Sequence, residues 1–317
     1  MRITCAGGRG IAAEIVFIVN PASANGRTRR AWKTHERAFR NAMKAPFAVR
    51  FTERPWHAAE LAKAAILSGA ETIVAVGGDG TLNEVVNGML DGTGRPWNPQ
   101  ARLAVFSVGT GSDFAKTLGI PRVASEVAVR IIGASERRID VGTAEFVHEG
   151  APRARYFINV GEFGSGGAVV DRVNRTTKVL GGRMSFLLAI LRTLPRYQNT
   201  RVTYRADGGA SREVVMNDFI VANGRFFGAG LQPAPQADPA DGLFDVVILG
   251  DIDFRTVRKN LRRLREGTHL DLPNVSHFRC RELEIESADE MIDLDGEYVG
   301  RHPTRFEIVP GAIRLVV

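Results

Sequence analysis

The sequence predicts two domains, an α/β domain built on a parallel sheet followed by a β-rich domain of the sandwich type. The chain has 317 residues, which is too long for one ordinary hydrophobic core. Its first half alternates short apolar runs with segments of helical periodicity, whereas several later runs alternate apolar and polar residues. We expect the α/β domain at residues 15–140 and the sandwich at 141–300, with 301–317 returning to the first domain.

The first domain is predicted from strands and helices that follow each other in turn. Residues 15–19 form a buried apolar run that ends at Asn20-Pro21, and residues 72–76 run directly into two glycines. Such alternation is typical of a parallel sheet with helices on both faces. The expected strands are 15–19, 47–52, 72–76 and 103–107, and the expected helices are 27–43, 58–67 and one through Leu82 and Met89.

The second domain is predicted from runs in which apolar and polar residues alternate. This pattern is typical of antiparallel strands that are buried on one face. One apolar helical stretch, 184–194, interrupts the strands. The expected strands are 156–160, 201–205, 214–222, 244–249, 283–286 and 291–294.

A glycine-rich loop follows the third apolar strand with the sequence Gly77-Gly78-Asp79-Gly80-Thr81. Glycine lets backbone N–H groups converge on an anion, and the helix that begins near this loop adds its dipole. The carboxylate of Asp79 would repel phosphate unless it meets a bound Mg²⁺, or hydrogen-bonds to a ribose or an acceptor. The alternative is a tight strand-to-helix turn in which Asp79 caps the helix.

A second glycine-rich loop, residues 109–114, also lies just beyond a strand. Its Thr110 and Ser112 offer hydroxyl donors, and Asp113 could cap the short helix that follows. Because the carboxyl ends of parallel strands meet at one edge of a sheet, the two loops could hold one nucleotide between them. The alternative is that both loops are only capped turns. Asn20-Pro21-Ala22-Ser23, after the first strand, would add a third polar segment to the predicted nucleotide site.

Composition narrows the possible partners and the compartment. The net charge of +7 would attract nucleic acid, anionic lipid or a nucleotide, or simply be solvated. Nucleic-acid binding is not expected, because no aromatic-basic module is present. Two cysteines indicate a reducing cytoplasm, and without an apolar run of bilayer length any membrane contact is expected to be peripheral.

Five motifs in order resemble those of the diacylglycerol kinase catalytic-domain family, which includes bacterial diacylglycerol kinase-like enzymes and sphingosine kinases. Residues 74–85, Val-Ala-Val-Gly-Gly-Asp-Gly-Thr-Leu-Asn-Glu-Val, resemble its nucleotide loop. The shorter Gly-Gly-Asp-Gly-Thr is shared with NAD kinases, so the ordered set carries the resemblance. The other matches are Asn20-Pro21, residues 109–115, the segment from Asn223-Gly224 to Val246, and Asp295-Gly296-Glu297.

The resemblance implies an NAD kinase/phosphofructokinase-like first domain and specific site residues. Glu297 would be the general base, with Asp295 and Asp79 close to it. Asp241, with main-chain oxygens near Asp238 and Leu243, would hold a structural Mg²⁺. Contacts with ATP would come from Asn20, Thr52, Gly77, Gly78, Asp79, Gly80, Thr81, Leu82, Asn83, Gly109, Thr110, Gly111 and Ser112.

Two departures from the family pattern concern the nucleotide contacts. Ser112 stands where the family often has Asn, which exchanges amide donors for one hydroxyl. Ala24-Asn25-Gly26 follows Ser23 where many members have Gly at once.

The function implied is an ATP-dependent lipid kinase of phospholipid metabolism that transfers the γ-phosphate to a lipid hydroxyl. Diacylglycerol, a sphingoid base, ceramide and an isoprenoid alcohol all remain open as acceptors, and a homodimer is also open. The alternatives are an NAD kinase and a non-catalytic regulator that binds ATP or lipid.

Two helical segments could bring a cytoplasmic kinase to its lipid at the inner membrane face. The apolar residues Val257, Leu261 and Leu264 would share one face of a helix. Such a helix could lie on anionic membrane, or its apolar face could simply pack on the core. Residues 184–194 are a candidate wall for acyl chains, although ordinary burial explains them too. The basic residues around the first face are Arg255, Arg258, Lys259, Arg262, Arg263 and Arg265.

Overall fold

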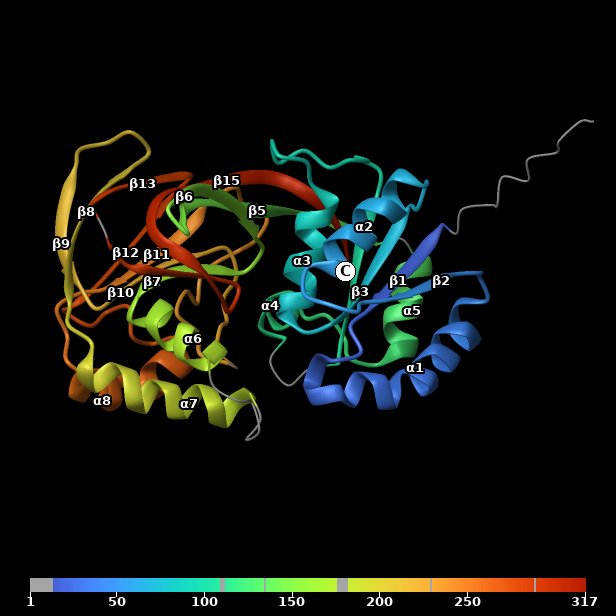
Figure 1. Cartoon of the computed structure of the whole chain (residues 1–317), viewed down its shortest axis with the longest axis horizontal. Helices are drawn as coiled ribbons and strands as arrows, with labels where there is room; N and C mark the ends of the chain where they lie inside the picture. The colour runs from blue at the N-terminus through green and yellow to red at the C-terminus, as the bar shows by residue number, and fades with distance from the viewer. Residues whose placement is uncertain (1–13, 109–111, 134, 176–181, 229, 288) are drawn as a thin grey trace, which may run out of the picture.

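A computed structural model describes residues 14–108, 112–133, 135–175, 182–228, 230–287 and 289–317 (Figure 1). Among these residues, 15 strands join in one hydrogen-bonded sheet that runs through both domains. The order along its main path is β12-β11-β10-β7-β14-β15-β4-β3-β1-β2. The predicted fold class, an α/β domain followed by a β-rich domain, is confirmed.

The first domain has a parallel sheet with helices on both faces. Strands β1, β2, β3 and β4 pair in parallel, and Val16 of β1 lies beside Ala48 of β2 and Ile73 of β3. Helices α2 and α3 cover one face, and α1 and α5 cover the other (Figure 1). The elements are β1 (Ile15–Val19), α1 (Arg27–Met43), β2 (Ala48–Phe51), α2 (His57–Leu67), β3 (Thr72–Gly77), α3 (Asp79–Met89), β4 (Arg102–Ser107), α4 (Asp113–Thr117) and α5 (Ala124–Gly133).

The second domain is built mainly from antiparallel strands, and its described helices lie along one side (Figure 1). Its strands β7, β10, β11 and β12 pair antiparallel in the main sheet. The elements are β5 (Glu136–His148), β6 (Ala151–Phe157), β7 (Val160–Gly164), α6 (Ser165–Arg175), α7 (Gly182–Thr193), β8 (Thr200–Ala206), β9 (Arg212–Met216), β10 (Asp218–Ala222), β11 (Phe244–Leu249), α8 (Phe254–Glu266), β12 (Val275–Cys280), β13 (Glu282–Ser287), β14 (Met291–Leu294) and β15 (Glu297–Val316).

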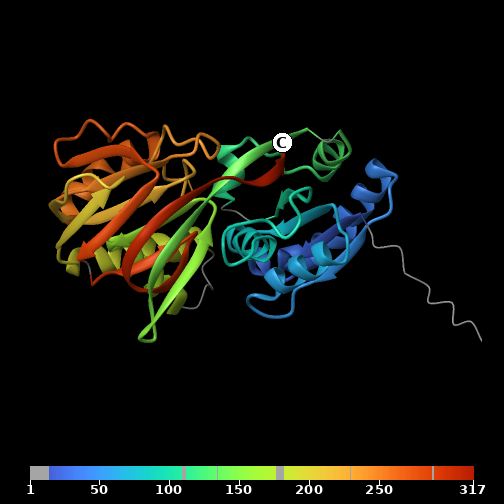
Figure 2. The ribbon, with the colours of Figure 1, turned by 90° about the horizontal axis from the view of Figure 1, so that it is seen from above.

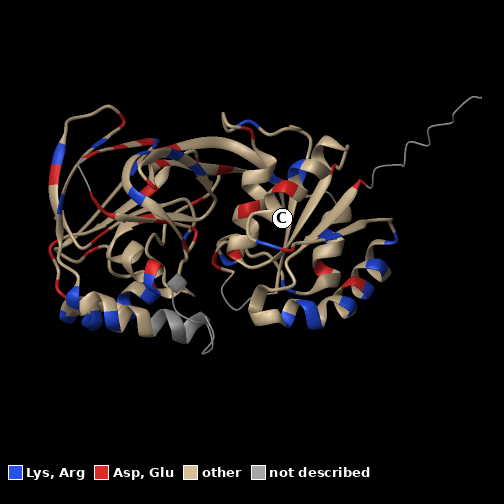
Figure 3. Ribbon diagram, viewed as in Figure 1, with Lys and Arg blue, Asp and Glu red and all other residues tan. Residues whose placement is uncertain are grey.

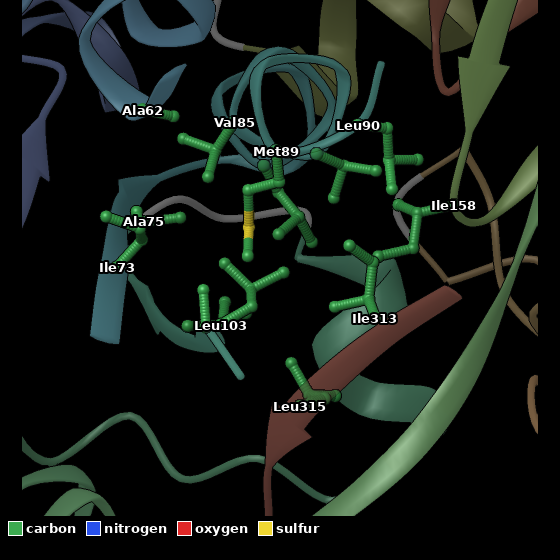
Figure 4. Close-up of a cluster of buried hydrophobic side chains, with 14 of the residues drawn as sticks. Ala62, Ile73, Ala75, Val85, Met89, Leu90, Leu103, Ile158, Ile313 and Leu315 are labelled. Atoms are coloured by element: carbon green, nitrogen blue, oxygen red, sulfur yellow. The ribbon is translucent and has the colours of Figure 1, made fainter. Parts of the chain in front are cut away.

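The long strand β15 ties the two domains together. It pairs with β14 in the second domain, and its end pairs in parallel with β4 through Arg314 and Leu315 (Figure 2). Ile313 and Leu315 therefore pack in the core of the first domain, near Met89 (Figure 4). The catalytic turn predicted at residues 295–297 connects β14 to β15, and Glu297 is the first residue of β15.

Two predicted strands differ in their boundaries from the sequence-based expectation. The predicted strand 156–160 is divided between β6 and β7, because β6 pairs with β5 whereas β7 pairs with β10 and β14. The predicted strand 214–222 breaks at Asn217, whose N–H donates to the Leu249 carbonyl (2.7 Å). Strands β5, β12 and β15, and helices α5 and α6, were not anticipated from the local pattern.

Helix α8 has its apolar face turned toward the protein. Val257 and Leu264 line a mainly apolar cavity of about 190 Å³ together with Leu249 and Leu272. Basic residues occur along this helix (Figure 3). The apolar face is only partly covered, since no residue of α8 is buried, and membrane contact stays a prediction. Within the described residues, no helix is long and apolar enough to cross a bilayer.

The predicted acyl-chain wall, residues 184–194, corresponds to α7 and its end. The side chains at 184–187 lie outside the described residues. Ala189 and Leu194 pack with Val169 of α6 in a small apolar cluster. Burial against α6 accounts for this part of the segment.

Gly88→Ala should destabilise the fold, because α3 crosses α2 closely at this position. A Cβ on Gly88 would lie 2.1 Å from the Ala59 carbonyl oxygen, so one backbone must move. We expect a loss of about 1–3 kcal/mol in the free energy of unfolding, measured by urea denaturation. Gly133→Ala in α5 is the matched control, since a Cβ there meets nothing within 4 Å. Equal stability of the two variants would contradict the close crossing.

Candidate active site

A large pocket opens beside the ends of strands β1 and β2. It has a volume of about 790 Å³, and its wall includes Asn20, Thr52 and Glu297. We call it the donor pocket. The loops after parallel strands are where α/β sheets bind their ligands. The other lining residues are Pro21, Ala22, Arg29, Phe51, Glu53, Arg54, Pro55 and Glu84.

The first glycine loop connects β3 to α3 beside this pocket. Gly77 ends the strand, Gly78 precedes the helix, and Asp79 is the first helical residue. Asn20 donates from Nδ2 to the hydroxyl of Thr81 (2.9 Å), which fixes the loop after β1 against the start of α3. The structure therefore brings these predicted residues together at one edge of the sheet.

Leu82 and Asn83, also predicted as nucleotide contacts, lie in the interior. They are 2% and 0% exposed, respectively. The Asn83 amide donates to Asp295 (2.7 Å) and to the Tyr156 carbonyl (3.0 Å). Asn83 thus holds α3 to the second domain, and neither side chain lines the donor pocket.

The Asp79 carboxylate links the first glycine loop to the second. It accepts the backbone N–H of Asp113 (3.1 Å) and of Phe114 (3.4 Å) at the start of α4. Burial, followed by the nearby charges of Asp113 and Asp295, raises the pKa of Asp79 to about 6. Asp79 thus accepts hydrogen bonds from the backbone of α4 and does not cap α3, the helix to which it belongs.

Glu297 reaches across from the second domain to the first glycine loop. A Cβ on Gly80 would lie 3.0 Å from Glu297 Oε1, so this carboxylate closely approaches the backbone of the loop. The other oxygen, Oε2, accepts a hydrogen bond from Arg155 (2.6 Å), which also donates to Asn83 Oδ1 (3.0 Å). The Arg155 guanidinium stacks 4.1 Å above the ring of Trp56. Arg155 thereby holds Glu297 with Oε1 directed at the loop.

Asp295 is a buried residue that fixes the turn before β15. Its carboxylate accepts the backbone N–H groups of Ile158 (2.9 Å), Asn159 (2.9 Å) and Val160 (3.0 Å), besides the Asn83 amide. Burial raises its pKa, and these four hydrogen bonds oppose the rise. Its contacts indicate that Asp295 positions the turn that carries Glu297.

Comparison with known proteins agrees with this geometry. The diacylglycerol kinase catalytic domain matches residues 14–144, and the YegS C-terminal NAD kinase beta sandwich-like domain matches residues 160–317. A diacylglycerol kinase from Bacillus subtilis is 31% identical over 251 residues, covering 78% of this chain and 78% of that protein. The chain belongs to the diacylglycerol kinase family. The resemblance inferred from the five ordered motifs is confirmed.

Further members and neighbours of the diacylglycerol kinase family extend the match. A probable lipid kinase YegS-like protein from Pseudomonas aeruginosa is 31% identical over 274 residues, covering 84% of this chain and 83% of that protein. A crystal structure of a diacylglycerol kinase from Bacillus anthracis superposes with a TM-score of 0.69 at 20% identity, covering 95% and 96% of the two chains. An NAD kinase from Archaeoglobus fulgidus has a TM-score of 0.50 at 15% identity, covering 95% of this chain and 92% of that one. At such identities these structures establish the shared fold.

The residues predicted to hold a structural Mg²⁺ are paired with arginines in this family member. Asp238 accepts two hydrogen bonds from Arg137 (2.7 and 2.8 Å), and Asp241 pairs with Arg279. The Leu243 N–H donates to Asp241 (3.1 Å). Within the described part of the chain, no three His, Cys, Asp or Glu side chains are arranged to hold an ion. Both acids thus have a cationic partner, and the Mg²⁺ site, which would combine Asp241 with main-chain oxygens, stays a prediction.

Three predicted residues of the second glycine loop, Gly109, Thr110 and Gly111, lie outside the described residues. Ser112 is described and lies buried with a φ of 57° as the residue before α4. Its carbonyl accepts the Lys116 N–H (3.2 Å).

Sequence-based reasoning missed two residues that the fold brings to this region. Arg155 is one of two arginines in β6, and nothing in the local sequence indicates its contact with Glu297. Glu162 lies in the middle of the otherwise uncharged strand β7. An acid in such a run is unusual, because burying a charge without a partner is costly, and this signal could have been noticed.

Proposed function

We propose that this chain is an ATP-dependent lipid kinase that transfers the γ-phosphate of ATP to a lipid hydroxyl. One observation carries the proposal: Glu297 Oε1 faces Gly80 while Glu297 also lines the donor pocket. A proton acceptor is thereby set beside a loop suited to hold a triphosphate. Membership of the diacylglycerol kinase family supports a lipid as the acceptor.

The donor pocket supports nucleotide binding through backbone and side-chain groups. The start of α3 presents N–H groups and a positive dipole, and Asn20 and Thr52 add polar contacts. Arg29 and Arg54 bring positive charge to a wall that also carries Glu53, Glu84 and Glu297. Arg54 is paired with Glu60 (2.6 Å), which leaves Arg29 as the cation at this wall with no ion pair among the described residues. Phosphate groups placed here would lie next to Gly77–Thr81 and within reach of Glu297.

The proposed step is an in-line displacement at phosphorus. The acceptor oxygen forms a bond to the γ-phosphorus while the bond to the bridging oxygen breaks, so that ADP leaves with the bridging oxygen. The hydroxyl proton passes to Glu297 Oε1, because Arg155 already occupies Oε2. The products are a lipid phosphate monoester and ADP.

The remaining acids would act through position. Asp79 ties the two glycine loops together through the N–H groups of Asp113 and Phe114, and Asp295 anchors the turn that carries Glu297. Mg²⁺ bound to the nucleotide would neutralise triphosphate charge. Asp238 and Asp241 have no role in this step, since each is held by an arginine.

A phosphotransfer screen tests the proposal. The purified protein is incubated with γ-labelled ATP and detergent-dispersed lipids: diacylglycerol, ceramide, a long-chain amino alcohol and an isoprenoid alcohol. NAD is included as a competing acceptor. We expect label in a lipid phosphate that partitions into organic solvent, and none in NADP. Labelled NADP, or release of phosphate from ATP with no lipid product, would contradict the proposal.

A further inference from the structure

A second pocket lies on the other side of the catalytic turn. It has a volume of about 190 Å³, roughly six times the share of one water molecule in the liquid. We call it the inner pocket. Asp79, Asp295 and Gly296 line it, whereas Glu297 lines the donor pocket. The turn at residues 295–297 therefore separates two pockets, as expected if donor and acceptor approach it from opposite sides.

The inner pocket is strongly acidic. Five carboxyl residues line it, and no Lys or Arg is among the described residues of its wall. Lys116, which is close by, is paired with Asp113 (2.6 Å). Phosphate would be repelled from such a wall, so this pocket suits the acceptor better than the nucleotide. The five acids are Asp79, Asp113, Glu162, Asp293 and Asp295.

Glu162 differs from the other acids of this pocket, because no hydrogen bond or ion pair among the described residues explains its position. It lies on β7 directly opposite Asp293 of β14 and Ile220 of β10, so these side chains share one face of the sheet. Helix α6 packs on that face, and its residue Gly166 makes room for the carboxyl group. A Cβ on Gly166 would lie 2.4 Å from Glu162 Oε1.

Two buried acceptor atoms in the wall lack a hydrogen-bond partner among the described residues. Glu162 is 3% exposed and its Oε2 is unpartnered, and the same is true of Oδ1 of Asn159, which is 4% exposed. Burial, followed by the charges of Asp218 and Asp293, raises the pKa of Glu162 well above its ordinary value. A carboxyl with a raised pKa readily binds a proton while the pocket is empty, whereas a cation beside it favours the ionised form. A protonated amine brings both donors for the two unpartnered oxygens and a positive charge for the acidic wall.

We propose that the acceptor carries a positively charged amine next to the hydroxyl that is phosphorylated, and that Glu162 is its counter-charge. The substrate class is a long-chain amino alcohol. The inference rests on the proposed lipid kinase activity and specifies its acceptor. The ammonium group enters the inner pocket, the hydroxyl stays at the turn beside Glu297, and Val160, Val170 and Phe227 contact the adjoining hydrocarbon.

The competing acceptors differ in what they offer to this wall. The ester groups next to the free hydroxyl of diacylglycerol bring only hydrogen-bond acceptors, which leaves Glu162 Oε2 unpartnered. A long-chain N-acyl amino alcohol brings one neutral N–H and loses the charge. Only the free amine provides several donors together with a positive charge.

The test compares one lipid with its neutral derivative. The kcat/KM of the wild-type protein is measured for a long-chain amino alcohol and for the same lipid acetylated on nitrogen, in identical detergent micelles. We expect a preference for the free amine of about tenfold to a hundredfold, the range for a hydrogen bond to a charged partner. In Glu162→Gln the ratio of the two kcat/KM values should fall close to one, since the amide keeps the shape but not the charge.

Glu290→Gln is the matched control. Glu290 is also buried, but it accepts from Tyr197 (3.0 Å) and Thr200 and does not line the inner pocket. This variant should keep the wild-type preference. Equal or better use of the N-acetyl lipid or of diacylglycerol by the wild-type protein would overturn the amine proposal alone, as would an unchanged ratio in Glu162→Gln. Phosphorylation of no lipid at all would overturn the proposed function as well.

Discussion

Glu297→Gln should lower kcat with a lipid acceptor by about a hundredfold to ten-thousandfold, the usual contribution of a general base. The amide oxygen can still accept the hydrogen bond from Arg155 that the carboxylate receives at 2.6 Å. The amide cannot take up the proton of the attacking hydroxyl. Substrate positions should therefore be preserved while proton transfer is lost, so the change appears in kcat rather than in nucleotide affinity.

Two measurements on Glu297→Gln separate these effects. Steady-state phosphorylation of the best lipid gives kcat, and calorimetric titration with a non-hydrolysable ATP analogue gives the dissociation constant. Glu53→Gln is the control, because Glu53 lines the same donor pocket but is exposed and lies on the loop after β2. It should keep most of the wild-type kcat. A fully active Glu297→Gln protein would rule out Glu297 as the base.

Asp79→Asn should lower activity and yet raise stability at neutral to alkaline pH. The activity loss follows from position: the Asp79 carboxylate holds the N–H groups of Asp113 and Phe114, and thereby the two loops proposed to hold the phosphates. An amide can serve only one of these donors. A displacement on the order of 1 Å in such a loop can lower the rate about a hundredfold.

The raised pKa of Asp79 determines whether Asp79→Asn stabilises or destabilises the folded protein at a given pH. The pKa of Asp79 is about 6 in the folded protein against an ordinary 3.8, so the folded state binds this proton more tightly. That contribution to stability is fully present below about pH 4 and is lost as the pH rises through 6. At pH 8 the ionised carboxylate destabilises the fold, and the neutral amide avoids this cost.

The net gain at pH 8 should be modest and should reverse in acid. The full pKa shift corresponds to about 3 kcal/mol. Solvent screening at this half-buried residue and one lost hydrogen bond reduce the expected gain to roughly 1 kcal/mol. Urea denaturation of both proteins at pH 8 and near pH 4.5, without nucleotide, should show a variant more stable than wild type only at pH 8. A variant less stable at both values would contradict the raised pKa.

Asp91→Asn provides the control of opposite sign. Hydrogen bonds from Thr93 and Arg95 lower the pKa of Asp91, so its ionised form stabilises the fold at neutral pH. Its replacement should not increase stability at pH 8.

Much of the fold could be predicted from local pattern, because burial leaves a regular trace in the sequence. The apolar runs before Asn20 and Gly77 became β1 and β3, each completely or largely buried. The glycines after β3 could be recognised because few other residues tolerate a backbone that must approach an anion or a carboxylate closely. The ordered motifs also identified the family before any contact was known.

Pairing partners were harder to predict than elements. Which strand each segment pairs with determines the break at Asn217 and the division of residues 156–160 between β6 and β7. Several of these pairing partners are distant in the sequence. Strand β15 was missed for the same reason, since successive parts of it pair with different strands in the two domains.

The sequence by itself determined the two-domain α/β and β-rich architecture, the family, and the glycine loop with Glu297 as its expected partner. The tertiary structure decided which charges meet. Asn83 donates a hydrogen bond to Asp295, 212 residues away, and Arg155 holds Glu297. Arg137 and Arg279 pair with the acids predicted for Mg²⁺. The Oε2 atom of Glu162 has no hydrogen-bond partner among the described residues. Periodicity within one element reports whether a side chain is buried. The partner of a buried polar group depends on how distant elements pack, and no local pattern records that.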